Sequence, residues 1–313
     1  MEFGIALTNV LTTLFYLVPG YILKKIGRAE PGHLPTLSSV LVYIGTPFLM
    51  LSAFLSLDYD RAEFTGMGLF FAVSLVCQAL FHGICLAFIH LAGRKREVLP
   101  SSRVAACASV MGNVGFFGMP IVRAMFPDSP EAVCYSAMYM ISMNLIVFTA
   151  GVFCITGDRK YMSLRSAIFT PTVLGAAISL PCYFLGAKNF FPEALIGAIK
   201  TVGGMTTPLC MIILGIRLAS APIKRAFSNP AVYAAALGKL LVFPLFSYML
   251  VRFLPLPQEF KACLAVLSGT PCAAIILSLA EIHGKEASFS ADCILVSTLL
   301  CSFTIPLLTL IVR

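Results

Sequence analysis

Ten long, continuous apolar runs dominate this chain and restrict what it can fold into. A helix needs about 20 mostly apolar residues to cross a bilayer, and each run comes close to or exceeds that length. The runs cover residues 5–23, 34–56, 64–92, 103–126, 131–156, 166–186, 193–219, 230–253, 260–281 and 290–312. Transmembrane β-strands would instead alternate over segments of about ten residues. The pattern therefore predicts an all-α polytopic membrane protein with ten transmembrane helices.

The composition excludes the main soluble alternatives. Hydrophobic residues make up 59% of the 313 residues and charged residues 12%. Soluble domains average roughly 45–50% and about 25%. The net charge of +8 would indicate a nucleic-acid binder only if the basic residues formed a soluble patch, and here they lie in short loops between the runs. We therefore expect a lipid bilayer, and no nucleic acid, as a partner.

The distribution of Lys and Arg predicts how the chain is oriented. Loops after odd-numbered runs carry 14 of these residues, whereas the other loops and the C-terminal end carry six. The 14 are Lys24, Lys25, Arg28, Arg94, Lys95, Arg96, Arg103, Arg159, Lys160, Arg165, Arg217, Lys224, Arg225 and Lys285; the six are Arg61, Arg123, Lys188, Arg252, Lys261 and Arg313. Because cytoplasmic loops are enriched in Lys and Arg, the odd loops are predicted to be cytoplasmic and both termini to lie outside.

Proline-containing segments recur in the same order in the two halves of the chain. The matched prolines are Pro19 and Pro181 (offset 162), Pro47 and Pro208 (offset 161), and Pro120 and Pro271 (offset 151). Each run thus resembles the run five places later, which crosses the membrane in the opposite sense. The pattern predicts two inverted repeats of five helices, residues 1–157 and 158–313, an architecture typical of secondary transporters.

The fourth and ninth runs are predicted to contain broken helices near the bilayer midplane. The fourth contains Gly112-Asn113-Val114-Gly115-Phe116-Phe117-Gly118-Met119-Pro120, and the ninth contains Ser268-Gly269-Thr270-Pro271. Inside a helix, Gly costs about 1 kcal/mol and Pro about 3 kcal/mol relative to Ala. Since Pro is tolerated at the first helical position, we expect Pro120 and Pro271 to start second half-helices. Their N-terminal N–H groups would suit an anion. The alternative interpretation is two proline kinks without a site.

The segment Gly112–Pro120 resembles the crossover motif of the auxin efflux carrier (PIN-like) family, and Thr207-Pro208-Leu209-Cys210-Met211-Ile212-Ile213-Leu214-Gly215-Ile216-Arg217-Leu218 resembles the seventh-span motif of that family. The resemblance implies an elevator-type carrier and a homodimer. Spans 1, 2, 6 and 7 would form a scaffold, and spans 3–5 and 8–10 a moving transport domain. The asparagine and prolines of the family's crossover correspond to Asn113, Pro120 and Pro271. The short segment 157–165 replaces the long central loop of the plant members, which indicates a bacterial-type member in a bacterial inner membrane.

Polar and small residues inside the runs form the candidate substrate site. The candidates are Gln78, Gly112, Asn113, Gly115, Pro120, Asn144, Lys239, Gly269, Thr270 and Pro271. Asn113 could cap a half-helix or hold a carboxylate through its amide. Lys239 lies deep in the eighth run, 161 positions after Gln78, and could bind an anion or change protonation during transport. The alternative is a structural lysine that snorkels or pairs with a neighbour.

The leading function is a secondary transporter of small organic anions, such as carboxylates or auxin-like acids. The alternatives are a channel and a membrane-embedded enzyme that acts on lipid. No Asp or Glu lies inside the runs away from their ends, which disfavours the enzyme. The 11 cysteines form no CxxC pair and predict apolar packing rather than a metal site. We expect no cofactor, and H⁺ and Na⁺ both remain open as the coupling ion.

Overall fold

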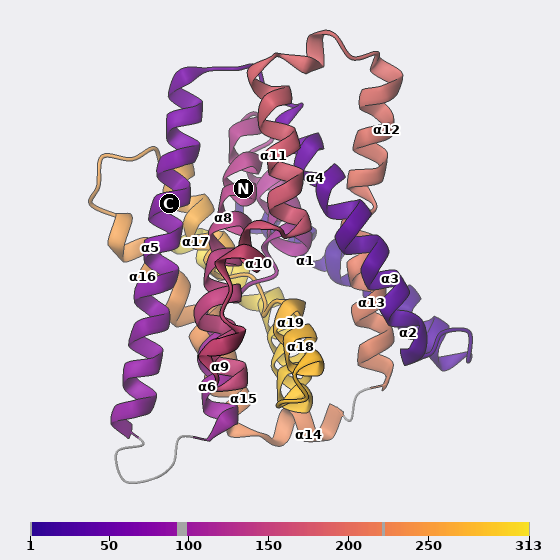
Figure 1. Ribbon diagram of the computed structural model, residues 1–313, viewed down its shortest axis with the longest axis vertical. Coiled ribbons are helices and arrows are strands. Elements are labelled where there is room, and N and C mark those ends of the chain that lie inside the picture. The colour runs from indigo at the N-terminus through magenta and orange to yellow at the C-terminus, as the bar shows by residue number, and fades with distance from the viewer. Residues whose placement is uncertain (1, 93–98, 221–222, 313) are drawn as a thin grey trace.

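The computed structural model of this protein describes residues 2–92, 99–220 and 223–312, so Arg94, Lys95, Arg96 and Arg313 lie outside the described residues. The described chain is helical throughout and forms an elongated bundle (Figure 1). The first-half helices are α1 (Glu2–Phe15), α2 (Leu17–Lys25), η1 (Pro31–His33), α3 (Leu34–Ser39), η2 (Val40–Gly45), α4 (Thr46–Phe54), α5 (Arg61–Ala92), α6 (Pro100–Ala108), η3 (Val114–Gly118), α7 (Met119–Met125), α8 (Pro130–Ile146), η4 (Val147–Gly151) and α9 (Val152–Thr156).

The second half has the same character. Its helices are η5 (Arg159–Tyr161), α10 (Leu164–Ile168), α11 (Pro171–Phe184), η6 (Ala187–Asn189), α12 (Glu193–Gly204), α13 (Thr206–Ser220), α14 (Ile223–Ser228), α15 (Pro230–Leu237), η7 (Gly238–Val242), α16 (Phe243–Val251), α17 (Gln258–Ser268), α18 (Ala274–Ile282) and α19 (Ala287–Ile311).

Seven helical stretches of the described chain are long and apolar enough to cross a membrane, and two shorter apolar helices accompany them. The seven are Phe3–Lys25, Leu34–Phe54, Arg61–Leu91, Pro130–Thr156, Glu193–Ser220, Pro230–Val251 and Ala287–Ile311; the two are Val114–Met125 and Pro171–Phe184. Large apolar side chains such as Phe88, Phe253 and Phe303 are exposed on the outside, as lipid-facing residues would be. The prediction of an all-α polytopic membrane protein is confirmed.

Three of the ten predicted runs are not continuous long helices. The fourth and ninth are interrupted, as described below. The sixth divides into α10 and α11, because Thr170 caps α11 and Pro171 occupies its first position. The Thr170 hydroxyl accepts the N–H of Val173 at 3.2 Å, which satisfies one of the free donors of a helix start.

The helices pack as two groups. In one, α2 lies along α13, and α4 packs against α11 and α12. Glycines permit the α2–α13 contact: a Cβ on Gly20 would overlap the Ile212 carbonyl oxygen, and one on Gly215 would overlap the Leu17 carbonyl oxygen. In the other group, α5 packs on α8, α6 on α9, and α16 on α17. The N-terminal helix α1 packs on α19 and α7 of this second group.

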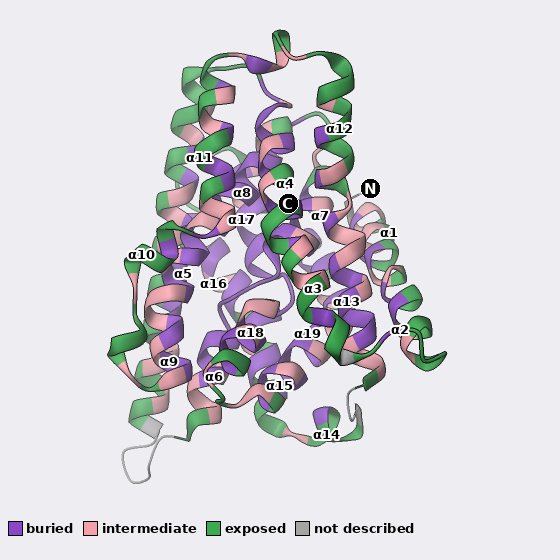
Figure 2. Ribbon diagram, turned by 45° about the vertical axis from the view of Figure 1, so that its right-hand side comes forward, coloured by how far each residue is buried: buried purple, intermediate pink, exposed green. Residues whose placement is uncertain are grey.

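Burial follows this arrangement. Figure 2 shows buried residues concentrated around α8, α16 and α17, while α11 and α12 present largely exposed faces. Thirteen residues of α8 are buried. The second group therefore contains most of the interior, and the interrupted helices α6–α7 and α17–α18 belong to it.

Candidate functional site

Two extended segments cross where the fourth and ninth helices are interrupted. Helix α6 ends at Ala108 and α17 ends at Ser268, and each is followed by five non-helical residues. Gly112 and Cys272 pair there as an antiparallel bridge. The Asn113 N–H donates to the Pro271 carbonyl at 2.7 Å, and the Ala273 N–H donates to the Met111 carbonyl at 3.0 Å. Each break therefore satisfies backbone groups of the other, as an interior without water requires.

Gly112 permits the close approach at this crossing. A Cβ on Gly112 would overlap the Thr270 hydroxyl and lie 2.9 Å from Lys239 Nζ. The sequence analysis included Gly112, Thr270 and Lys239 among the candidate residues, and the structure brings these three together. These three residues pack closely against one another at the crossing.

The prediction that Pro120 and Pro271 start second half-helices is wrong for Pro271 and holds only in part for Pro120, which lies in the first turn of α7 but follows the helical turn η3 directly. The helix after the first break begins at Val114, as the π-helical turn η3 that continues into α7, and α18 begins at Ala274. Pro271 lies in the extended segment, where its carbonyl bonds to Asn113. Asn113 has the non-helical φ of −77° and ψ of 63°, and its carbonyl accepts the N–H groups of Phe117 and Gly118, both at 3.1 Å. Inter-segment hydrogen bonds, rather than the prolines, decide where the helices restart.

A cavity of about 210 Å³ lies on one side of the crossing, between it and the helices η2, α4 and α13. Four of the predicted site residues line it: Gly112, Asn113, Gly115 and Asn144. The first turns of both half-helices also reach it, through Gly115 and Phe116 and through Ala274 and Ile275. The first N–H groups of a helix have no carbonyl of a preceding turn to bond to, so these turns offer free donors to the cavity.

Two buried asparagines supply amides to this cavity. Asn113 Nδ2 lies 3.9 Å from Cys210 Sγ, a weak contact that leaves the amide available to a ligand. Asn144 Nδ2 donates to the Thr170 hydroxyl at 3.3 Å, and Thr170 also lines the cavity. Apolar side chains, among them Phe116, Met140 and Phe148, make up the remaining wall.

Arg217 is the basic residue among those that line the cavity, although the sequence suggested for it only a topology charge and a place in the seventh-span motif. It is the last basic residue of α13 and lines the cavity, where its Nη1 donates to Glu281 Oε1 at 3.1 Å. The Arg217 side chain is 28% exposed, so it lies at the mouth of the cavity. Its position at the end of the seventh-span motif could have indicated a role in the site. From the sequence alone, however, a basic residue near a helix end cannot be distinguished from one that only sets the membrane orientation.

The other predicted residues do not line this cavity. Lys239 is fully buried behind Gly112, and its Nζ donates to the carbonyl of Ser268 at the end of α17. Gln78 is equally buried and donates to the Ser142 hydroxyl at 2.8 Å. Gly269, Thr270 and Pro271 face the packed interior. Of these, Lys239 and Thr270 pack against Gly112 at the crossing, whereas Gln78 bonds to residues of α5 and α8.

A second cavity of about 370 Å³ lies farther along the same helices. Pro120 and Arg123 of α7 line it, together with the start of α13 at Thr206–Pro208 and part of α1. Both cavities therefore contact α13. The first lies between α13 and η3, and the second lies between α13 and α7. Pro120 belongs to the second cavity rather than to the crossing.

Comparison with known proteins identifies the family. The family described as "Membrane transport protein" matches residues 5–309. The chain belongs to this family. It is the auxin efflux carrier family, so the resemblance of the crossover and seventh-span motifs is confirmed. Membership makes the protein a membrane transporter and not an enzyme.

Two archaeal proteins are similar to this membrane transport protein over nearly their whole length. An uncharacterized transporter of Methanocaldococcus jannaschii is 26% identical over 298 residues, which cover 92% of this chain and 93% of the relative. An uncharacterized transporter of Methanothermobacter thermautotrophicus is 22% identical over 303 residues, which cover 96% of each chain. The similarity extends across both interrupted helices and the cavity.

Proposed function

We propose that this membrane transport protein is a secondary transporter that carries small organic anions by an elevator-type movement. One observation supports this most directly: the free first-turn N–H groups of two half-helices, the Asn113 amide and the Arg217 guanidinium converge on one cavity. All of these groups are donors or positive, the described residues that line the cavity include no Asp or Glu, and Glu281 is paired with Arg217.

The cavity suits an organic anion better than an inorganic one. Each helix start contributes about 0.3–1 kcal/mol toward an anion when exposed, and up to ~2 kcal/mol when partly buried. A carboxylate next to Asn113 would receive those donors. The hydrocarbon part of the substrate would contact Phe116, Met140 and Phe148, which line the same space. Pockets for small organic ligands typically combine apolar walls with a few polar groups in this way.

The pairing of the two segments at the crossing supports the proposal of two inverted repeats. Gly112 and Cys272 are 160 positions apart (272 − 112 = 160), close to the offsets of 161 and 162 between the prolines of the other helices. This register replaces the offset of 151 obtained by matching Pro120 with Pro271. With it, ten membrane crossings divide into five and five, at residues 1–157 and 158–313.

The elevator movement is proposed on the two packing groups. Spans 1, 2, 6 and 7 would form the scaffold, and spans 3–5 and 8–10 would carry the crossing past it. The two cavities lie along the seam between these groups, one at the start of η3 and one along α7. A vertical shift of the crossing along α13 would connect the substrate first with one cavity and then with the other.

The homodimer is proposed from the family resemblance, and the orientation from the distribution of Lys and Arg. We propose a dimer through the scaffold spans in a bacterial inner membrane, with both termini outside and H⁺ or Na⁺ as the candidate coupling ions. A mass measurement in detergent that finds only monomer at micromolar concentration would count against the dimer.

Replacement of Asn113 tests the proposed site. Loss of one hydrogen bond to a charged ligand costs roughly 1.5–3 kcal/mol, or about ten- to a hundredfold in affinity. We expect Asn113→Ala to raise the Kd of a transported carboxylate by that factor, measured as the concentration dependence of thermal stabilisation and of uptake into proteoliposomes. A panel of carboxylates with and without Na⁺ at two pH values would identify the substrate first.

The matched control is Asn189→Ala, which changes the same residue type in η6, away from both cavities. It should leave affinity and transport unchanged. If well-folded Asn113→Ala protein retains wild-type affinity and uptake, the crossing is not the substrate site. Uptake without saturation at high substrate concentration would instead indicate a channel.

A further inference from the structure

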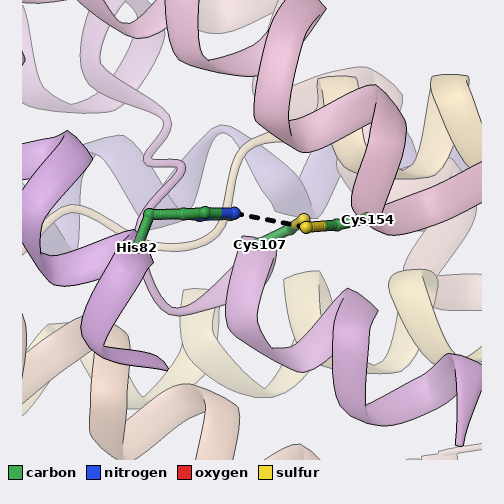
Figure 3. Close-up of side chains that lie close together, drawn as sticks. All are labelled: His82, Cys107 and Cys154. Atoms are coloured by element: carbon green, nitrogen blue, oxygen red, sulfur yellow. Dashed lines mark hydrogen bonds between the residues drawn. The ribbon is translucent and has the colours of Figure 1, made fainter. Parts of the chain in front are cut away.

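Three side chains that could ligate a metal meet inside the second packing group, away from the cavity. His82 comes from α5, Cys107 from the end of α6 and Cys154 from α9 (Figure 3). Their ligand atoms all lie within 4.8 Å of one another, and all three side chains are buried. Cys107 follows His82 by 25 positions, and Cys154 follows Cys107 by 47 positions. The three residues therefore do not form a local metal-binding motif in the sequence.

The distances in the cluster are compatible with three ligands of one tetrahedral zinc ion. Zn–S distances are about 2.3 Å and Zn–N distances about 2.0–2.1 Å, so a sulfur and a nitrogen on one ion lie about 3.6 Å apart. His82 Nε2 and Cys154 Sγ are 3.3 Å apart, and Figure 3 shows both sulfur atoms next to the imidazole. An ion between the three atoms requires only small side-chain movements.

Weak contacts to sulfur hold this cluster together. His82 Nε2 contacts Cys154 Sγ at 3.3 Å. His82 Nδ1, the other ring nitrogen, is buried without a hydrogen-bond partner within residues 2–92, 99–220 and 223–312, and it would keep the imidazole proton when Nε2 binds an ion. Cys107 Sγ donates a weak thiol hydrogen bond to the Gly151 carbonyl at 3.7 Å, a contact that a metal-bound thiolate would give up. Since polar groups in an apolar interior are costly unless paired, a ligand that uses all three atoms would stabilise this region.

Charge balance selects a divalent, thiophilic ion. Binding displaces one proton from each thiol, so M²⁺ with two thiolates and a neutral imidazole forms a site with no net charge and releases two protons. A monovalent ion such as Cu⁺ would leave one negative charge buried in the membrane interior, which is expensive. Oxygen-preferring ions such as Mg²⁺ and Ca²⁺ do not suit two sulfurs.

We propose that His82, Cys107 and Cys154 form a structural site for Zn²⁺ or a similar thiophilic divalent ion. The ion would fasten α6, which leads directly into the crossing at Gly112, to α5 and α9. The fourth coordination position remains for a non-protein ligand or for the Gly151 carbonyl. The site is independent of the substrate and of the transport mechanism proposed above.

The test uses the full-length protein from cells grown with added Zn²⁺, because the ligands are buried and the ion has to enter before or during folding. Purification under a reducing agent uses an affinity tag without histidines. We expect about one zinc per chain by elemental analysis. Protein made with Co²⁺ instead should show a thiolate-to-cobalt charge-transfer band in the near ultraviolet.

The variants are His82→Ala, Cys107→Ser and Cys154→Ser, with Cys301→Ser as a control for a buried cysteine of α19 outside the cluster. Each ligand variant should retain less than about a tenth of the bound metal, whereas the control should bind as wild type does. If one ligand variant fails to insert, the other two carry the comparison. Zinc should also raise the Tm of the wild type and not that of a ligand variant.

Two results would overturn the proposal. One is wild-type protein that contains no more zinc than the ligand variants and shows no cobalt band. The other is a disulfide between Cys107 and Cys154 in metal-free protein purified in parallel without the reducing agent, which would make the pair a redox element. Neither result affects the substrate site, since Asn113→Ala tests that separately.

Discussion

At the scale of single residues, Lys239 has a supporting role that differs from the anion-binding role considered from the sequence. Its Nζ donates to the Ser268 carbonyl and lies 5.0 Å from the centre of the Phe243 ring. The carbonyl end of a helix carries partial negative charge, so an ammonium at the end of α17 stabilises that helix terminus. Lys239 also packs against Gly112, and so positions the crossing without lining the cavity.

We therefore expect Lys239→Gln to act on stability more than on substrate affinity. The shorter side chain cannot keep the bond to Ser268, and a buried acceptor without a partner costs about 1–3 kcal/mol. The free energy of unfolding should fall by that amount, while the substrate Kd changes less than in Asn113→Ala. Lys200→Gln on the exposed side of α12 is the control and should change neither quantity. A tenfold loss of affinity at unchanged stability would mean that Lys239 binds the substrate.

At the scale of helices, close contact through glycine determines how the scaffold packs. Gly20 on α2 and Gly215 on α13 each face the backbone of the other helix, and Gly175 and Gly203 bring α11 and α12 onto α4 in the same manner. Membrane helices associate mainly by van der Waals packing, which small residues at the interface improve. Helices packed this closely form a rigid group, as the proposed scaffold requires.

Gly215→Ala should separate α2 from α13. Its Cβ would collide with the Leu17 carbonyl and with the backbone nitrogen of Tyr21, 2.9 Å away, neither of which can move without the helix. Overpacking of this kind typically costs 1–3 kcal/mol of stability. We therefore expect the purified variant to unfold at a lower Tm than the wild type. Gly197→Ala on α12 is the matched control, because a Cβ at Gly197 would point into open space. Alanine there should be neutral or stabilising by up to about 1 kcal/mol; equal losses in both variants would refute the packing argument.

At the scale of the whole molecule, the orientation rests on the distribution of positive charge. Helix α14, with Lys224 and Arg225, lies at one end of the molecule, opposite the connection between α11 and α12 (Figure 1). Arg225 forms a bidentate pair with Asp292 of α19, with N–O distances of 3.0 and 3.1 Å. The predicted cytoplasmic end thus holds both topology charges and inter-helix ion pairs.

Reporter fusions test this orientation. A fluorescent protein that matures only in the cytoplasm should stay dark when fused after Arg313, and a phosphatase active only outside should be active there. The same two reporters inserted after Asp158, in a predicted cytoplasmic loop, should give the opposite pattern. Fluorescence of the C-terminal fusion would mean that the orientation is the opposite of the predicted one. Arg217 would then lie on the outer side of the membrane.

The sequence by itself determined the membrane class, most of the long helices and the approximate places of the two breaks, but not the division of the sixth run at Thr170. A chain in lipid has to satisfy its own backbone groups, so long apolar runs become helices and clusters of Gly, Asn and Pro interrupt them. The motifs at Gly112–Pro120 and Thr207–Leu218 were sufficient for the family, since they depend on local backbone requirements.

Only the tertiary structure decided which of the predicted residues line the cavity at the crossing and which lie behind it. The helices restart at Val114 and Ala274 because Asn113 and Ala273 bond to carbonyls of the other segment, a contact between residues 160 positions apart. The inward position of Arg217 and the meeting of His82, Cys107 and Cys154 likewise depend on helices distant in the chain. Helical periodicity specifies which face of a helix is apolar, but which neighbour covers that face is a property of the packed bundle.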